Sequence, residues 1–108
     1  MQQFKSEFFK ALANPLRIQI LEILAQGDRG VNEIQQLAES EGLRVSQQLT
    51  VLRSRNMVTS IKNGNRVIYS LQDPLIVELL DVARKIFNNQ LSEKITILDR
   101  LNYTDKTE

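Results

Sequence analysis

The side chains that could do chemistry in this sequence are polar and basic, and they gather between Gly42 and Gln72. That stretch contains no Asp or Glu and five Arg or Lys residues, whereas the rest of the chain contains nine basic and thirteen acidic residues. A local excess of positive charge is typical of a surface that binds an anionic partner, although a chance fluctuation gives the same pattern. The net charge of the whole chain, +1, conceals this asymmetry.

Composition excludes several other kinds of chemistry. The chain has no Cys and no His, so a disulfide, a thiolate or imidazole zinc site, a cysteine nucleophile and a Ser-His-Asp triad are impossible. It also lacks a glycine-rich phosphate loop. Carboxylates such as Glu78, Asp81 and Glu93 could bind a hard cation, but a charged solvent face is their expected role. We therefore expect neither an enzyme nor a bound metal or cofactor.

Helices and one hairpin must position the polar residues. Apolar residues at helical spacing, an Asn14-Pro15 start signal and breaks around Gly27 and Gly42 predict four helices. They are expected at about residues 2–13, 15–26, 31–38 and 43–54. Two β-prone runs on either side of Asn63-Gly64-Asn65 predict a hairpin over residues 58–71.

The fourth of these helices has one apolar and one polar face. Val45, Leu49 and Leu52 are spaced i, i+4 and i+7, which places them on a single narrow stripe. Gln47 points directly away from that stripe. A helix with such a polar face fits the major groove of DNA, and a basic hairpin beside it can reach the backbone or the minor groove. The third and fourth helices with the hairpin therefore predict a winged helix-turn-helix.

A long last helix is expected after Asp73-Pro74. Its apolar pattern lasts about 28 residues, or about 42 Å, whereas a compact domain of this size has a radius of gyration of about 13 Å. A second copy of the chain, related by a two-fold axis, is the expected cover for this stripe. A helix lying on a membrane surface is the alternative, but acidic residues offset the basic ones along it. Without an apolar run of about 20 residues or a secretion signal, a cytoplasmic protein is expected.

Residues 9–71 resemble the ArsR/SmtB family of winged-helix repressors. The matching segments are FKALANPLRIQIL (9–21), VNEIQQL (31–37), VSQQLTVLRSRNMV (45–58) and NGNRVIYSL (63–71). The resemblance implies a mainly α fold with a small β-hairpin wing, in the order of four helices, two strands and a fifth helix. One domain is then expected over 1–108, with dimerisation helices at 1–13 and 73–102, the helix-turn-helix at 31–54 and the wing at 58–71.

The function that this resemblance implies is repression of transcription. A homodimer would bind an imperfectly palindromic operator in double-stranded DNA, with two recognition helices about 34 Å apart. A winged helix can also use the same surface to bind a protein, so a protein-interaction module is the alternative. Metal sensors of the family use a Cys-x-Cys motif in the third helix or His-containing ligand sets in the last helix. Because this chain lacks Cys and His, it is not expected to sense metal in that way, and its effector is not indicated.

The fourth helix supplies five of the predicted DNA contacts. Ser46 and Gln47 match the base-reading pair of the family, while Arg44 and Thr50 flank this face as expected phosphate contacts. Gln48 also matches a family position, but it lies toward the core, where helix packing is the preferred role. An ordinary solvated helix face is the alternative for all of them.

The wing supplies the other predicted contacts, namely Lys62, Asn63, Asn65 and Arg66. Arg66 matches the wing arginine of the family. It is expected to enter the minor groove or to pair with a phosphate, because guanidinium groups suit both sites. The alternative is an ordinary surface arginine on a hairpin.

Overall fold

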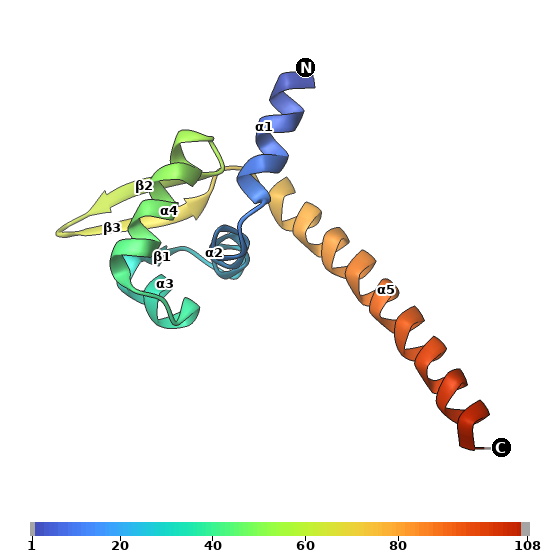
Figure 1. Cartoon of the computed structure of the whole chain (residues 1–108). Coiled ribbons are helices and arrows are strands. Elements are labelled where there is room, and N and C mark those ends of the chain that lie inside the picture. Colours follow the sequence, from blue (N-terminus) through green and yellow to red (C-terminus); the bar gives the residue numbers. More distant parts are fainter. Residues whose placement is uncertain (1, 107–108) are drawn as a thin grey trace. The chain divides into compact units, whose positions relative to one another are not determined.

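The computed structural model describes residues 2–106, with side chains to Leu101, and residues 1, 107 and 108 of the predicted domain lie outside this range. The chain divides into two units, of which the first ends at Val77 and the second begins at Glu78. Its elements are α1 (Gln2–Leu12), α2 (Pro15–Ala25), β1 (Arg29–Gly30), α3 (Val31–Ala38), α4 (Gly42–Ser54), β2 (Val58–Asn63), β3 (Arg66–Leu71) and α5 (Leu75–Lys106) (Figure 1). The predicted order of four helices, a hairpin wing and a long last helix is confirmed.

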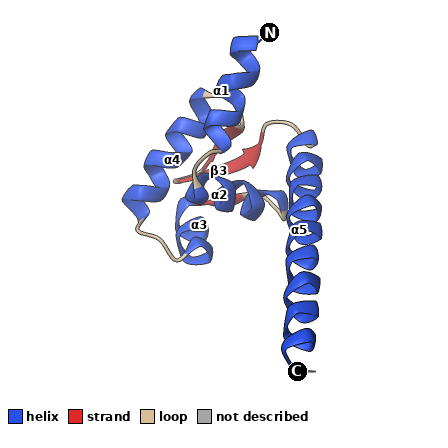
Figure 2. Cartoon of the chain, turned by 45° about the vertical axis from the view of Figure 1, so that its right-hand side comes forward, coloured by secondary structure: helices blue, strands red, loops and turns tan. Residues whose placement is uncertain are grey.

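The sheet contains one strand that sequence patterning missed. It is antiparallel in the order β1-β3-β2, and Figure 2 shows its strands in red beside the blue helices of the first unit. In the hairpin, Asn63 pairs with Arg66 across a turn in which Gly64 has φ 66°, a conformation that favours glycine. The added strand β1 pairs Gly30 with Ile68. Two residues are too short to show an alternating pattern, which is why β1 was not predicted.

Local signals explain where α2 and α5 begin. The Asn14 side-chain oxygen accepts hydrogen bonds from the backbone N–H groups of Leu16 (2.9 Å) and Arg17 (3.1 Å), so Asn14 caps α2 as predicted. The Asp73 carboxylate likewise accepts from the N–H of Leu75 at 2.9 Å. These caps satisfy donors that have no partner inside the helix.

A tight turn joins α3 to α4. Glu39 takes the left-handed conformation at φ 51° and ψ 43°, and the N–H of Ser40 donates to the Gln35 carbonyl at 3.2 Å. Gly42 then begins α4, and a Cβ added to it would lie 2.9 Å from the Gln35 side-chain oxygen. The turn therefore brings the start of α4 close against α3, as a helix-turn-helix requires.

The core of the first unit is apolar throughout its described residues. Its largest fully buried side chains are Ile20, Leu21, Ile34, Val45, Leu49, Leu52, Met57 and Val58. They come from α2, α3, α4, the turn after α4 and the first residue of β2. No polar or charged residue within the described range is buried, so the hydrophobic effect accounts for the packing of these elements.

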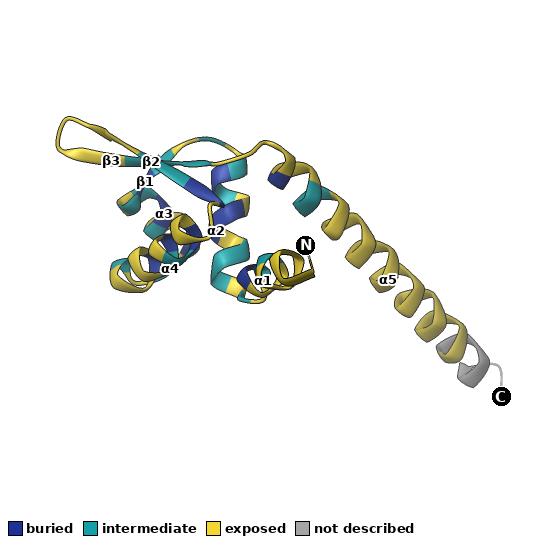
Figure 3. Ribbon diagram, turned by 90° about the horizontal axis from the view of Figure 1, so that it is seen from above, coloured by how far each residue is buried: buried dark blue, intermediate teal, exposed yellow. Residues whose placement is uncertain are grey.

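The second unit consists of the greater part of α5. From Val82 to Leu101 all of its residues are exposed, and Figure 3 shows this stretch in yellow. Phe87, Leu91, Ile95 and Leu98 recur at helical spacing and are each 45–61% exposed. The helix reaches Lys106, a few residues beyond the predicted end. None of the helices in the described range combines the length and the hydropathy of a membrane span.

Candidate nucleic-acid interface

The polar face of α4 is set by the burial of its opposite face. Val45, Leu49 and Leu52 have no exposed surface, as their spacing predicts. Ser46 and Gln47 are consequently exposed to solvent. Within the described residues the structure gives the Gln47 side chain no hydrogen-bond partner, so its amide and carbonyl groups are both available to a ligand.

The Thr50 hydroxyl already has a partner. Its Oγ1 donates to the Ser46 carbonyl at 3.0 Å, one turn earlier in α4. A hydroxyl has a single proton to donate, and a phosphate oxygen requires a donor. Thr50 can therefore contact a phosphate only if its hydroxyl rotates away from the helix.

Gln48 connects α4 to α2. It is half-buried, and its Oε1 accepts a hydrogen bond of 2.7 Å from Nε of Arg17. Arg17 also donates from Nη1 to the Ala11 carbonyl at 3.4 Å. Of the two predicted alternatives for Gln48, this geometry favours helix packing, because the side chain is half-buried and its oxygen already accepts from Arg17 of α2.

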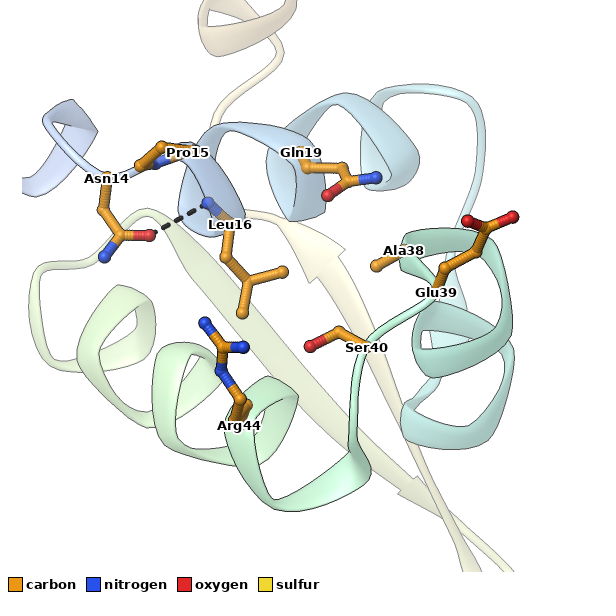
Figure 4. A pocket seen from close by; sticks show the side chains of 8 residues that line it. All are labelled: Asn14, Pro15, Leu16, Gln19, Ala38, Glu39, Ser40 and Arg44. Atoms are coloured by element: carbon orange, nitrogen blue, oxygen red, sulfur yellow. Dashed lines mark hydrogen bonds between the residues drawn. The ribbon is translucent and has the colours of Figure 1, made fainter.

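Arg44 lies beside the polar face of α4, against a pocket of about 340 Å³. The pocket is formed by the start of α2, the end of α3 and the start of α4. Figure 4 shows the guanidinium of Arg44 directed toward Leu16, with the Ser40 hydroxyl and the Asn14 side chain nearby. No ion pair holds Arg44 within the described residues, so its charge can meet an anion at this edge of the helix-turn-helix.

The predicted wing residues lie together at the hairpin end. Lys62 and Asn63 end β2, Asn65 is in the turn, and Arg66 begins β3; all four are exposed. The Lys62 ammonium has no ion pair among the described residues. This end of the hairpin therefore presents a cation and amide groups to solvent.

Arg66 has an acidic partner that sequence reasoning missed. Its Nη2 donates to Oε1 of Glu33, which lies in the first turn of α3. The two residues are 33 positions apart, and no local pattern links them. The spacing of Gly30 and Glu33 could have drawn attention to the carboxylate, since an acid at the third helical residue often bonds back to the capping residue.

A second basic residue of the acid-free stretch is also paired. Nη1 of Arg55, just after α4, is 2.5 Å from Oε2 of Glu7 in α1. The positive charge at the end of α4 is therefore partly neutralised by α1. Arg55 is thus in the same situation as Arg66, since a carboxylate occupies one guanidinium nitrogen of each.

Carboxylates do not gather into a metal site. Among the described residues there is no group of three or more Asp or Glu side chains that could hold an ion. On α5, Asp81 is instead paired with Arg84 and, at 3.1 Å, with Lys85. Hydrogen bonds from Lys85 and Arg84 lower the pKa of Asp81, so this carboxylate serves a surface ion-pair network.

No family model matches this chain. It is 45% identical over 104 residues to an uncharacterized HTH-type transcriptional regulator of Mycobacterium tuberculosis, Rv0081, a match that covers 94% of this chain and 90% of that protein. The crystal structure of Rv0081 superimposes with a TM-score of 0.80, covering 87% of this chain and 95% of the other.

Two further matches bear on the type of protein. A transcriptional repressor SmtB homolog of Synechocystis is 35% identical over 77 residues, which cover 71% of this chain and 58% of that protein. The solution structure of Mb0332 from Mycobacterium bovis has a TM-score of 0.78 at 28% identity and covers 85% of each chain. It is described as a homodimeric winged helix-turn-helix DNA-binding domain of a possible ArsR-family transcriptional regulator.

Proposed function

This chain belongs to the ArsR/SmtB family of helix-turn-helix transcriptional regulators, and we propose that it is a sequence-specific DNA-binding repressor that acts as a homodimer. One observation carries the proposal. The face of α4 with Ser46 and Gln47 is exposed, polar and free of acidic residues, and it belongs to the same unit as a wing with Lys62 and Arg66. This combination suits base edges in the major groove and phosphates beside it.

Each part of the proposed interface has its own task. Ser46 and Gln47 read base edges, and Gln47 can form paired hydrogen bonds with adenine N6 and N7. Arg44 and Thr50 contact phosphates at the edge of α4, while Gln48 supports this face through Arg17. The wing contacts the backbone or minor groove through Lys62, Asn63, Asn65 and Arg66. None of these proposed contacts involves a catalytic step. We place the protein in the cytoplasm, because its operator DNA lies there.

The proposed dimer buries apolar surface that is exposed in one copy. The stripe of Phe87, Leu91, Ile95 and Leu98 on α5 is the main candidate, and Phe4 and Phe9 of α1 are exposed as well. Contiguous apolar surface of this kind marks an interaction site. We assign the ranges 1–13 and 73–102 to dimerisation, 31–54 to the helix-turn-helix and 58–71 to the wing, within one functional domain.

Selection of bound sequences from a random DNA pool at about 0.15 M salt tests the proposal. A two-fold symmetric site with half-sites about one helical turn apart should be enriched. Binding should weaken steeply as salt rises, because phosphate contacts release counterions. No enrichment by a folded dimer, together with a salt-insensitive protein complex, would support a protein-interaction module instead.

A further inference from the structure

One carboxylate joins the first turn of α3 to the wing. Oε1 of Glu33 accepts a hydrogen bond from the Gly30 N–H at 3.3 Å and another from Nη2 of Arg66. Gly30 belongs to β1 and pairs with Ile68 of β3, two residues after Arg66. Glu33 therefore connects the start of the helix-turn-helix, the short strand β1 and the strand that carries the wing arginine.

Gly30 and Arg29 surround the contact between Glu33 and Arg66. A Cβ added to Gly30 would lie 3.0 Å from Nη2 of Arg66, so the absence of a side chain at Gly30 lets the guanidinium approach closely. Arg29 adds a second positive charge, with its Nη1 4.0 Å from Oε2 of Glu33. The Arg29 Nε is buried, and it has no hydrogen-bond partner within the described part of the chain. Two cations thus converge on one carboxylate.

Arg66 keeps donors free while it is held. A guanidinium carries five N–H donors, and only Nη2 contacts Glu33. The Arg66 side chain is 63% exposed, so the donors on Nε and Nη1 can reach an outside acceptor. A planar guanidinium held at one nitrogen has a restricted orientation, which lowers the entropy lost when it then binds a phosphate.

We propose that Glu33 is a positioning residue for DNA binding: it holds Arg66 of the wing so that the remaining guanidinium donors face a phosphate of the DNA backbone. This inference rests on the proposed function, since it assigns a role within that interface. Glu33 itself does not touch DNA. It acts through Arg66, and through Gly30 it fixes where the wing stands relative to α3.

Glu33 is in the charged form that this role requires. The hydrogen bond from the Gly30 N–H lowers the pKa of its carboxyl, and the hydrogen bond and charge of Arg66 lower it further. The carboxylate is thus ionised at neutral pH. Replacing Arg66 with Ala should raise this pKa toward its ordinary value, which carboxyl-detected NMR measures without any DNA.

The direction in which Glu33→Gln changes the affinity for DNA distinguishes a positioning role from a purely electrostatic effect. Glu33→Gln removes a negative charge from the neighbourhood of the wing, and by Coulomb repulsion alone this should tighten DNA binding. The glutamine oxygen can still accept from the Gly30 N–H and from Arg66, but without the carboxylate charge it holds the guanidinium more weakly. If Glu33 positions Arg66, binding should instead weaken by about three- to tenfold.

Glu41→Gln is the matched control. Glu41 is an exposed acid next to α4, its side chain makes no capping hydrogen bond, and no ion pair holds it within the described residues. The same charge change at this site should leave binding equal to wild type or tighter. Thermal unfolding of both variants establishes that they are folded.

Combining substitutions shows whether Glu33 acts through Arg66. Arg66→Ala should weaken binding and reduce the salt slope by about one counterion. In that background Glu33→Gln should no longer weaken binding. A folded Glu33→Gln protein that binds as tightly as wild type, or an equal loss with and without Arg66, would overturn the positioning role. If the wild-type protein enriches no DNA sequence, the proposed function itself fails. An unchanged Glu33 pKa in Arg66→Ala overturns the contact and with it the positioning role, but leaves the proposed function intact.

Discussion

At the scale of single residues, the two neighbouring glutamines of α4 have the same type of side chain but different surroundings. Gln47 is exposed and has no side-chain partner within the described residues, whereas Gln48 is half-buried and bonded to Arg17. Their directions differ by about 100°, the rotation of one residue in an α-helix. The burial of Leu49, next in sequence, turns Gln48 toward the core. Gln47 is therefore the proposed base reader, whereas Gln48 connects α4 to α2.

Replacing Gln47 with Ala should relax sequence preference rather than abolish binding. Removing a paired contact to a base edge is expected to lose about 1–3 kcal/mol of discrimination at one or two base pairs in each half-site. Binding to a set of operators with single base-pair changes measures this. Unchanged discrimination at every position would show that Gln47 is not a base reader.

The matched substitution Gln48→Ala should act on stability. It leaves Nε of Arg17 without its acceptor at a half-buried site, so a loss of about 1–2 kcal/mol in the free energy of unfolding is expected. Base preference should stay as in wild type. Urea denaturation measures the first effect and the same operator set measures the second; a relaxed preference without loss of stability would contradict the packing role.

Sequence reasoning at this scale succeeds for contacts within one element and fails for contacts between distant ones. The stripe of Val45, Leu49 and Leu52 follows from helical spacing alone. The pair of Arg17 and Gln48 is separated by 31 positions and that of Arg55 and Glu7 by 48, so only the packed fold brings them together. The predicted DNA contacts of the nine site residues remain predictions.

At the scale of elements, caps and turns define the bounds that the sequence predicts. Asn14 and Asp73 begin two helices, and Gly64 permits the hairpin turn. The strand β1 depends instead on the rest of the fold, because two residues become a strand only when β3 lies beside them. Local chemistry therefore predicts the helices and the hairpin, while the third strand requires tertiary contacts.

Asn14→Ala should destabilise α2 and with it the first unit. The substitution removes the acceptor for two backbone N–H groups, so the free energy of unfolding should fall by about 1 kcal/mol. Glu41→Ala at the start of α4 is the control, because the Glu41 side chain makes no capping hydrogen bond. Urea denaturation of both variants measures this. Equal losses in the free energy of unfolding would show that the Asn14 side-chain cap does not stabilise α2.

At the scale of the whole molecule, the proposed function requires two copies of the chain. One α4 can read only one half-site, and a two-fold operator needs a second α4 at a fixed separation. Linking two reading helices gains affinity because the second binding event becomes intramolecular. The apolar stripe of α5 supplies surface for that link, and it contributes nothing to the core residues of the first unit.

Leu91→Glu should therefore separate dimerisation from folding. Leu91 lies within the stripe and is 45% exposed, so a carboxylate there is tolerated in one copy but would be buried without a partner in the proposed dimer. Sedimentation should show a shift from dimer to monomer. Affinity for the two-fold site should fall by about a hundredfold, as expected for lost bivalency.

Asn89→Glu places the same charge two residues earlier on α5, on the side of the helix away from Leu91, and should leave both the dimer and DNA binding unchanged. Thermal unfolding of the first unit should be similar in both variants, because its core contains no residue from this part of α5. A Leu91→Glu protein that remains dimeric would exclude Leu91 from the interface. A monomer that retains wild-type affinity for the two-fold site would contradict the requirement for two linked reading helices, since one helix contacts only one half-site.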